Sequence, residues 1–397
     1  MVAATRTRTG RTARLYAFSF FDDFILIYPL YAVMFAHAGI RPLQITILFA
    51  VWSLTAFLLE VPAGVIADRF PRRTVLTLGL LLRAGGFGVW LVDRHFAGFL
   101  VGFVLWGLKS AFTSGTKEAL VYDQLRQVGQ LPLYARVTGR MQSLSLMAVV
   151  GASLLAAVLA PRGYSLLLTF SIAAILVSVW AIWSLPAAPH ERSGTPPSYV
   201  GVLRSGGRLV RQRADVLYWI ALMSVVAGLG AGDEYFGVFL RQHAYSNTGI
   251  AFWTAVIFLL GALGSAVAHR WEHRRLPVVP ILFGWAAVLY AAAVAPRDFG
   301  PLLLGAYLFV FGAARVVANA RLQDLLTDST RATVTSVGGV GSEFLALVSF
   351  GLMGLGSEGS HGYAAGYEWM AYAIAAAACS FLLLRRRIRS QAQAMRP

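Results

Sequence analysis

Ionisable side chains recur inside the long apolar segments of this 397-residue chain. A charge at the centre of a membrane costs at least about 2.5–3.5 kcal/mol on insertion scales, so each one is a candidate for substrate binding or proton transfer. Carboxylates take up and release protons, which makes the acidic residues of the first two segments candidates for proton coupling: Asp22, Asp23 and Glu60. The alternative is that the two aspartates form structural ion pairs with Arg83 or a lysine of another segment.

The two lysines of the chain, Lys109 and Lys117, lie in one apolar segment, whereas the gaps between segments use arginine. Unlike arginine, lysine can lose its proton when it is desolvated. At 100° per residue, Lys109, Thr113 and Lys117 share one helical face, and Glu118 lies nearly opposite Lys109. We expect this face to line a substrate cavity, unless Lys117 reaches the membrane surface and pairs there.

Segments of the second half carry further polar residues at membrane depth. Arg315 and Glu343 each fall near the middle of a segment. If they face each other they would neutralise one another, either as a structural pair or as substrate contacts. The candidates for the substrate cavity are Tyr28, Arg83, Lys109, Thr113, Lys117, Glu118, Asp233, Glu234, Arg315, Asn319 and Glu343.

The elements that must position these residues are membrane-spanning helices. The chain is 57% hydrophobic and 13% charged, whereas soluble proteins carry about 25% charged residues. A span needs roughly 20 apolar residues, and the segments lack the two-residue alternation of an outer-membrane barrel. We predict an all-α integral membrane protein with twelve transmembrane helices, over residues 15–36, 43–67, 74–94, 97–122, 136–160, 164–185, 215–240, 249–269, 277–295, 299–323, 333–356 and 363–384.

The distribution of arginine predicts the topology. With the N-terminus inside, most arginines fall on the cytoplasmic side, as the positive-inside rule requires, and both termini are cytoplasmic. We expect the protein in the cytoplasmic membrane. The arginine-rich start imitates a secretory signal, but Asp22, Asp23 and the length of the apolar run favour a true span. The longest polar gap is predicted to be a linker, residues 186–213, between six-helix bundles at 1–185 and 214–397.

Weak internal similarity predicts that the two bundles are pseudo-symmetric copies. The stretch "EALVYDQL" matches "NARLQDLL" and brings Asp123 onto Asp324, an offset of 201 residues, and at the same offset "ADR" matches "AHR". Asp233 follows Asp22 by 211 residues, so we treat the likeness of the two acidic pairs as coincidental. Transporters built from repeats place their substrate site near the bilayer midplane, where the halves meet.

The connector after the second segment resembles the signature loop of the major facilitator superfamily. The pattern G-x-x-x-D-R-x-x-R-R is carried by Gly64, Asp68, Arg69, Arg72 and Arg73. Pro71 stands where that pattern usually has glycine. Together with the twelve spans and the linker, the resemblance covers essentially the whole chain. It implies a latch that holds the two halves together in the outward-facing state, and Asp123 is a carboxylate that the arginines can bridge.

Several classes of function lack the residues that they need. The patterns H-E-x-x-H, G-x-S-x-G and G-x-x-x-x-G-K-[ST] do not occur, so no hydrolase or ATPase site is predicted and we do not expect an enzyme. The histidines are dispersed and Cys379 is the single cysteine, so we expect no metal and no cofactor. The net charge of +16 is spread over the gaps between segments, which argues against nucleic acid as a partner. We expect a monomer.

These features favour a secondary transporter. We expect proton-coupled export of small, drug-like organic molecules across the lipid bilayer, by rocker-switch alternating access. Antiporters of the superfamily that the chain resembles usually carry a G-P-x-x-G-G-like motif in the fifth span, where this chain supplies only Gly151 and Pro161. The alternative is therefore proton-coupled uptake of a small metabolite, such as an anion held by Lys109, Arg83 or Arg315. A non-transporting receptor would leave the intramembrane charges without a purpose.

Overall fold

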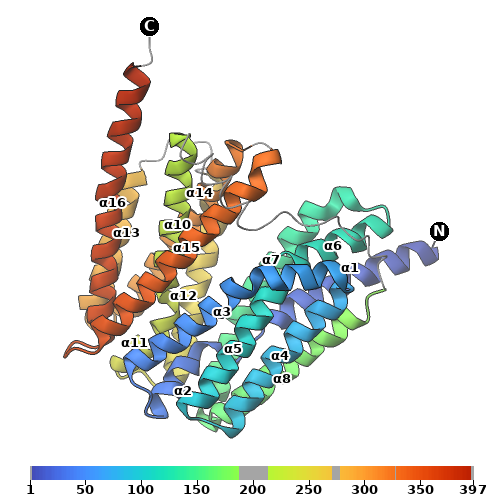
Figure 1. Ribbon diagram of the computed structural model, residues 1–397. Helices are drawn as coiled ribbons and strands as arrows, with labels where there is room; N and C mark the ends of the chain where they lie inside the picture. The colour runs from blue at the N-terminus through green and yellow to red at the C-terminus, as the bar shows by residue number, and fades with distance from the viewer. Residues whose placement is uncertain (1, 187–212, 271–277, 327, 395–397) are drawn as a thin grey trace. The chain divides into compact units, whose positions relative to one another are not determined.

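The computed structural model describes residues 2–186, 213–270, 278–326 and 328–394, and the regular secondary structure of these residues is helical (Figure 1). Nearly all of the predicted linker, residues 187–212, lies outside the described residues. The chain divides into two compact units, one formed by Met1–Pro196 with Tyr245–Ala255 and the other by Pro197–Ala244 with Val256–Pro397. Each unit is described below by itself.

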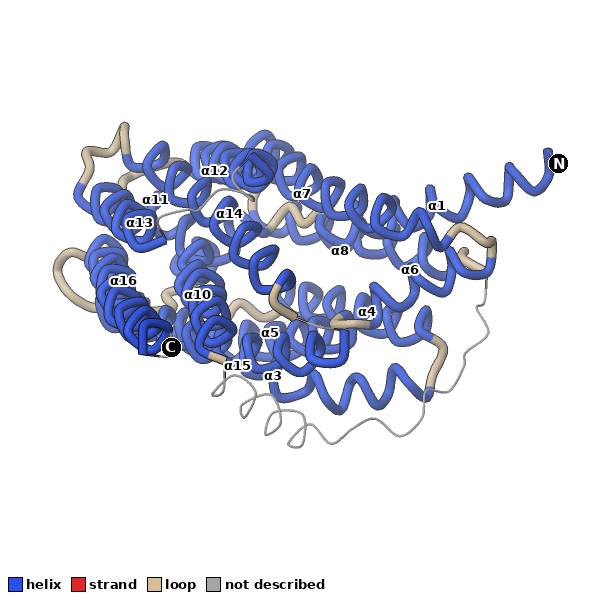
Figure 2. Tube along the Cα trace, turned by 90° about the horizontal axis from the view of Figure 1, so that it is seen from above, coloured by secondary structure: helices blue, strands red, loops and turns tan. Residues whose placement is uncertain are grey.

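The helices of the first unit follow one another with short connections. In chain order they are α1 (Val2–Asp23), the 3-10 turn η1 (Tyr28–Leu30), α2 (Tyr31–His37), α3 (Pro42–Arg69), α4 (Arg72–Val92), α5 (Phe96–Thr113), α6 (Thr116–Gln127), α7 (Tyr134–Leu159) and α8 (Tyr164–Trp183). Within this unit α5 packs against both α3 and α4, and α1 packs against α7 and α8 (Figure 2).

The second unit repeats this arrangement of long helices. Its helices are α10 (Ala214–Leu229), the 3-10 stretch η4 (Gly230–Tyr235), α11 (Phe236–Gln242), α12 (Asn247–Val267), α13 (Val278–Val294), α14 (Gly300–Asp324), α15 (Asp328–Ser357) and α16 (Tyr363–Ala394). The start of α12 clusters with the first unit. Across the described residues, 11 segments are long and apolar enough to cross a membrane, and α13, with 17 residues, is a shorter apolar helix. Together they correspond to the twelve predicted spans.

The first span is broken, although the sequence predicted one helix over residues 15–36. Helix α1 ends at Asp23, and the chain passes through η1 before α2 begins. Pro29 lies at the start of η1, and proline lacks a backbone N–H and clashes with the preceding turn, which favours a break in the helix at this place. Ser171 of α8 accepts a hydrogen bond from the backbone N–H of Ile27 at 3.1 Å, which satisfies a group that the break leaves free.

The fourth span is also broken, and this corrects the prediction of one helix over 97–122. Helix α5 ends at Thr113 and α6 begins at Thr116. Between them Gly115 has a φ of +69°, a conformation that glycine adopts without steric cost. The rotation of 100° per residue therefore does not apply between Lys109 and Lys117, because they lie on different helices. The helical face that the sequence predicted for them does not follow from their spacing.

The seventh span contains the counterpart of the first break. The sequence predicted a helix over 215–240, but η4 interrupts it between α10 and α11. Helices α2 and α11, which follow the two breaks, each have 7 residues. Asp233 lies inside η4, whereas Asp22 lies in the last turn of α1 before the break. The two breaks thus occupy corresponding places in the repeat, and the two acidic pairs do not.

Close helix contacts in the second unit depend on glycine. A Cβ added at Gly264 of α12 would lie 2.1 Å from the backbone oxygen of Phe309 on α14. Because backbone cannot move aside as a side chain can, Gly264→Ala is expected to force the two helices apart and to destabilise the protein by about 1–3 kcal/mol or more. Thermal unfolding of the purified protein measures this loss.

Gly284→Ala is the matched control, since a Cβ at Gly284 on α13 would meet no atom within 4 Å. Alanine in a helix is favoured over glycine by about 0.5–1 kcal/mol, so this variant is expected to be at least as stable as the parent. Equal unfolding midpoints for the two variants would show that α12 and α14 do not approach as closely as the structure has them.

Candidate functional site

Three charged side chains from three helices meet in the interior of the first unit. Arg83 of α4 donates from Nη2 to Oδ1 of Asp22 at 2.6 Å and to the backbone oxygen of Asp22 at 2.6 Å. Lys109 of α5 places its Nζ 3.1 Å from Oδ1 and 3.1 Å from Oδ2 of Asp22. The exposed fractions are 2% for Asp22, 2% for Arg83 and 8% for Lys109. We call these three residues the charge triad.

The end of α1 explains why the triad forms at this place. The last carbonyl groups of a helix have no partner inside the helix, and a single arginine satisfies both the backbone oxygen and the carboxylate of Asp22. Arg83 belongs to the buried stripe of α4, which also contains Leu80 and Phe87, so its guanidinium is directed into the unit. The break after Asp23 is therefore what makes an acceptor available to Arg83.

The triad holds one negative and two positive charges. Burying charges is expensive unless they are paired and hydrogen-bonded, and here one carboxylate is shared by two cations. Asp23, the next residue, is partly buried and interacts electrostatically with Lys109. Lys117 lies nearby, because its Nζ donates to the Ser19 hydroxyl at 3.2 Å and sits 5.4 Å from the centre of the Phe18 ring. The region around Asp22 is thus richer in cations than in anions.

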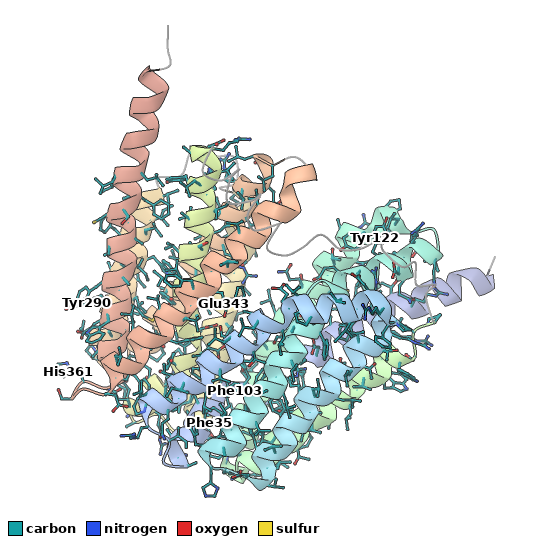
Figure 3. The ribbon with its side chains drawn as sticks, in the orientation of Figure 1. Phe35, Phe103, Tyr122, Tyr290, Glu343 and His361 are labelled. Carbon is teal, nitrogen blue, oxygen red and sulfur yellow. The ribbon has the colours of Figure 1, made fainter. Side chains whose placement is uncertain are left out.

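An aromatic cluster adjoins the triad. The Arg83 guanidinium lies 6.0 Å from the ring centre of Trp106. The Trp106 ring lies 6.0 Å from that of Phe103 and 5.9 Å from that of Trp52, and Phe103 lies 5.7 Å from Phe35 (Figure 3). Within the described part of the chain, the buried indole N–H of Trp52 has no hydrogen-bond partner. The cluster offers flat apolar surface and one free donor beside a charged group.

The other predicted residues of the first unit are spread more widely. Glu60 is exposed on α3 and accepts a hydrogen bond from the Ser114 hydroxyl at 2.7 Å. Thr113 donates to the Lys109 carbonyl of its own helix at 2.8 Å. Glu118 is exposed on α6, and Tyr28 is partly buried, with its ring 5.7 Å from that of Tyr31. Of the candidates in this unit, the structure gathers Asp22, Arg83 and Lys109.

The loop that carries the G-x-x-x-D-R-x-x-R-R pattern is tied to α6 and to the end of α8. Arg72 pairs with Asp123 of α6 at 3.3 Å, with both side chains 21% exposed. Arg73 lies 5.0 Å over the Trp183 ring and donates to the Leu185 carbonyl at 3.3 Å. Arg69 is exposed at the end of α3, Asp68 is partly buried, and a Cβ at Gly64 would meet no atom within 4 Å.

In the second unit, three hydroxyl groups hold the backbone at the break of the seventh span. The Ser349 hydroxyl donates to Gly228 O, Tyr307 to Leu229 O and Tyr367 to Gly232 O, each at 2.9 Å. Sequence reasoning missed these contacts, because serine and tyrosine are ordinary residues of membrane helices. The glycine-rich run "GLGAGDE" is the one signal of an irregular backbone at this place.

The remaining candidates of the second unit lie on three helices. Arg315 and Asn319 are exposed on α14, and Glu343 is partly buried on α15 (Figure 3). Asp233 and Glu234 are partly buried, and Arg315 interacts electrostatically with Asp233. The pairing of Arg315 with Glu343 stays a prediction.

The loop between two spans of the first unit holds a close acid–histidine pair. In the loop between α4 and α5, Asp93 accepts hydrogen bonds from the His95 ring at 2.8 Å and from the His95 backbone N–H at 3.0 Å. These bonds stabilise the carboxylate and lower the pKa of Asp93. Among the residues that the structure describes, no three histidine, cysteine, aspartate or glutamate side chains gather as a metal site would require.

Comparison with known proteins identifies a family and a curated relative. A family model described as Major Facilitator Superfamily matches residues 14–350. The multidrug resistance protein MdtH of Klebsiella pneumoniae (strain 342) is 28% identical over 207 residues, which are 50% of this chain and 48% of MdtH. The match therefore spans about half the length of the curated relatives.

Solved structures of several transporters share the fold. The nucleoside transporter NupG gives a TM-score of 0.76 at 14% identity, over 94% of this chain and 98% of NupG. The D-xylose-proton symporter gives 0.73 at 12% identity, over 94% of this chain and 96% of the symporter. A bacterial homologue of the lysosomal transporter Spinster gives 0.71 at 15% identity, over 96% and 95% of the two chains. At these identities the likeness concerns the fold alone.

Proposed function

This chain belongs to the Major Facilitator Superfamily, and on that premise we propose that it exports small organic molecules in exchange for protons by alternating access. It is a multi-pass membrane transporter of small molecules. In our proposal the moving bodies are the bundles 1–185 and 214–397, joined by the linker 186–213. Both termini are cytoplasmic, the membrane is the cytoplasmic membrane, and the transporter acts as a monomer.

The observation that carries this proposal is the charge triad. A buried ion pair gives little net stability compared with apolar packing of the same volume, so three charged side chains in one membrane interior are better explained by function. Asp22 shared between Arg83 and Lys109 is a contact that a charged substrate can rearrange. A change of charge at this point alters which conformation of the unit is favoured.

The direction of transport and the kind of substrate rest on the relatives and on the aromatic cluster. MdtH is named as a multidrug resistance protein, and export of drug-like compounds is the activity that its name suggests. The rings around Trp106 and Trp52 suit a flat lipophilic compound, since aromatic faces stack on such molecules. Arg72 and Asp123 pair within the first unit, and the role of the loop as a latch that holds the two halves together in the outward-facing state stays a prediction.

A second candidate function is proton-coupled uptake of a small anionic metabolite. The observation that favours it is the excess of cations in this region of the first unit, where Arg83, Lys109 and Lys117 outnumber the carboxylates of Asp22 and Asp23. An anion that binds at Lys109 would neutralise positive charge that Asp22 does not neutralise. The two candidates differ in the charge of the substrate.

Reconstituted transport distinguishes the candidates. The protein is placed in liposomes with a trapped pH indicator, and ethidium, a neutral sugar and a dicarboxylate are added in turn. Export in exchange for protons predicts that ethidium moves protons against its own flux, and that the double variant Asp22→Asn, Asp23→Asn alters this exchange. Uptake of the dicarboxylate with protons, lost in Lys109→Ala, would replace export with the second candidate. Compound movement that is equal with and without a pH gradient would refute proton coupling.

A further inference from the structure

Side-chain hydroxyls bind the backbone at the break in the seventh span. The carbonyl groups of Gly228, Leu229 and Gly232 accept hydrogen bonds from hydroxyls of α15, α14 and α16. Tyr307 and Tyr367 are fully buried, so these contacts fix the backbone at the end of α10 and within η4. Asp233 follows Gly232 directly, at the centre of this arrangement.

The carboxylate of Asp233 lies in a setting unlike that of Asp22. It interacts with the backbone N–H groups of Asp233 itself and of Glu234, and with Arg315 over a longer range. In the described part of the chain it forms no ion pair. As a residue Asp233 is partly exposed, whereas Asp22 is 2% exposed. The partners of the carboxylate are thus backbone N–H groups and a more distant arginine rather than a paired cation.

The groups around Asp233 come from every helix packed against η4. Asp233 interacts electrostatically with the hydroxyls of Tyr307 and Tyr367, and Tyr235 and Tyr363 stand next to Tyr367. The charged residues that these helices contribute along their membrane-spanning parts are Arg315, Arg321 and Asp324 of α14, Glu343 of α15, Glu368 of α16, Arg241 of α11 and Asp215 at the start of α10. Arg315 is the one that interacts with Asp233.

Protonation has opposite consequences at the two aspartates. Adding a proton to Asp22 would leave Arg83 and Lys109 without their anion in a dry interior, and breaking a buried pair costs about 3–5 kcal/mol. Adding a proton to Asp233 removes a charge that has no ion-pair partner, which is favourable at membrane depth. A proton also has to arrive from water, and of the two residues Asp233 is the more exposed.

We propose that Asp233, rather than Asp22, is the residue that binds and releases the transported proton. This inference rests on the proton coupling in the proposed function and names its site. The carboxylate takes one proton from water and returns it to water after the conformational change, with no other bond made or broken. Loss of its charge weakens its hold on the N–H groups of Asp233 and Glu234 within η4 and on Arg315, so the segment between α10 and α11 becomes free to reorient.

The test is infrared spectroscopy of the full chain in lipid. A protonated carboxylic acid has a carbonyl stretching band that a carboxylate and an amide lack. Spectra are compared between neutral and mildly acidic pH, above the range near pH 4 in which exposed carboxylates titrate. We expect a band that appears on acidification in the parent protein, that is lost in Asp233→Asn and that is retained, at a shifted frequency, in Asp233→Glu.

Three variants keep the assignment falsifiable. Glu234→Gln is the matched neighbour, and Asp22→Asn and Glu60→Gln remove other candidates; the band is expected to persist in all three. A band that survives in Asp233→Asn, or that disappears in Asp22→Asn or Glu60→Gln, would overturn the proposal. If Asp233→Asn does not fold, the frequency shift in Asp233→Glu decides the matter, since an unshifted band belongs to another residue.

The spectra need no substrate, which separates this inference from the proposed function. If the band belongs to Asp233 but no compound moves protons in liposomes, the proton site stands and the proposed exchange fails. If compounds move protons but the band does not belong to Asp233, the exchange stands and the assignment fails.

Discussion

Replacing Arg83 by alanine is expected to lower the free energy of unfolding by about 3–5 kcal/mol. The change removes the guanidinium that donates to both the carboxylate and the backbone oxygen of Asp22. It leaves Asp22, which is 2% exposed, with Lys109 as its remaining cation. Thermal unfolding of the purified protein, followed by tryptophan fluorescence, measures the loss as a lower midpoint.

Two further variants show whether the loss comes from the buried charge. Arg140→Ala removes an exposed arginine of α7 in the same unit and is expected to change stability by less than about 0.5 kcal/mol. Adding Asp22→Asn to Arg83→Ala removes the uncompensated carboxylate and is expected to restore part of the stability. Midpoints for Arg83→Ala and Arg140→Ala that agree within error would mean that the triad is not formed as described.

Replacing Lys109 by methionine is expected to slow transport at least about tenfold, the equivalent of 1.4 kcal/mol in the barrier. Methionine keeps the length and apolar stem of the side chain but removes the ammonium that contacts Asp22 at 3.1 Å. Of the two triad cations, Lys109 is the one that can lose its proton. The measurement is the initial rate of proton movement evoked by whichever compound of the panel is transported.

Lys117→Met provides the comparison within the same span. Lys117 contacts the Ser19 hydroxyl and the Phe18 ring rather than the carboxylate of Asp22, so we expect a smaller loss of rate than in Lys109→Met. Equal losses in the two lysine variants, with equal amounts of folded protein, would contradict a specific role for the triad.

The spans of this fold are readable from the sequence, and the breaks within them are readable only in part. Apolar length alone marks a membrane helix, and for that reason the predicted segments correspond to the observed helices. Pro29 and Gly115 are visible signals of the first and fourth breaks. The sequence prediction did not include these breaks, because it recognised a span by the length of its apolar run. A single proline or glycine within a long apolar run does not change that length.

The candidate site is harder to read, because its contacts join separate helices. Asp22, Arg83 and Lys109 stand out as charges at membrane depth, but their partners depend on how α1, α4 and α5 pack. Helical periodicity describes neighbours on one helix and fails across the break at Gly115. Nothing in the sequence marks the hydroxyls of Tyr307 and Tyr367 as important. They bind backbone carbonyl groups at the break between α10 and α11, and this break is seen only in the structure.

The most direct test of the proposed proton-coupled export is whether a pH gradient alone moves a compound uphill. Liposomes containing the protein are loaded with equal ethidium on both sides, and a pH gradient is then imposed in each direction. Exchange for protons predicts that ethidium accumulates on the more acidic side, and that reversing the gradient reverses the accumulation. Ethidium that stays equally distributed under both gradients, while it equilibrates through the protein, would contradict coupling and leave a facilitated carrier.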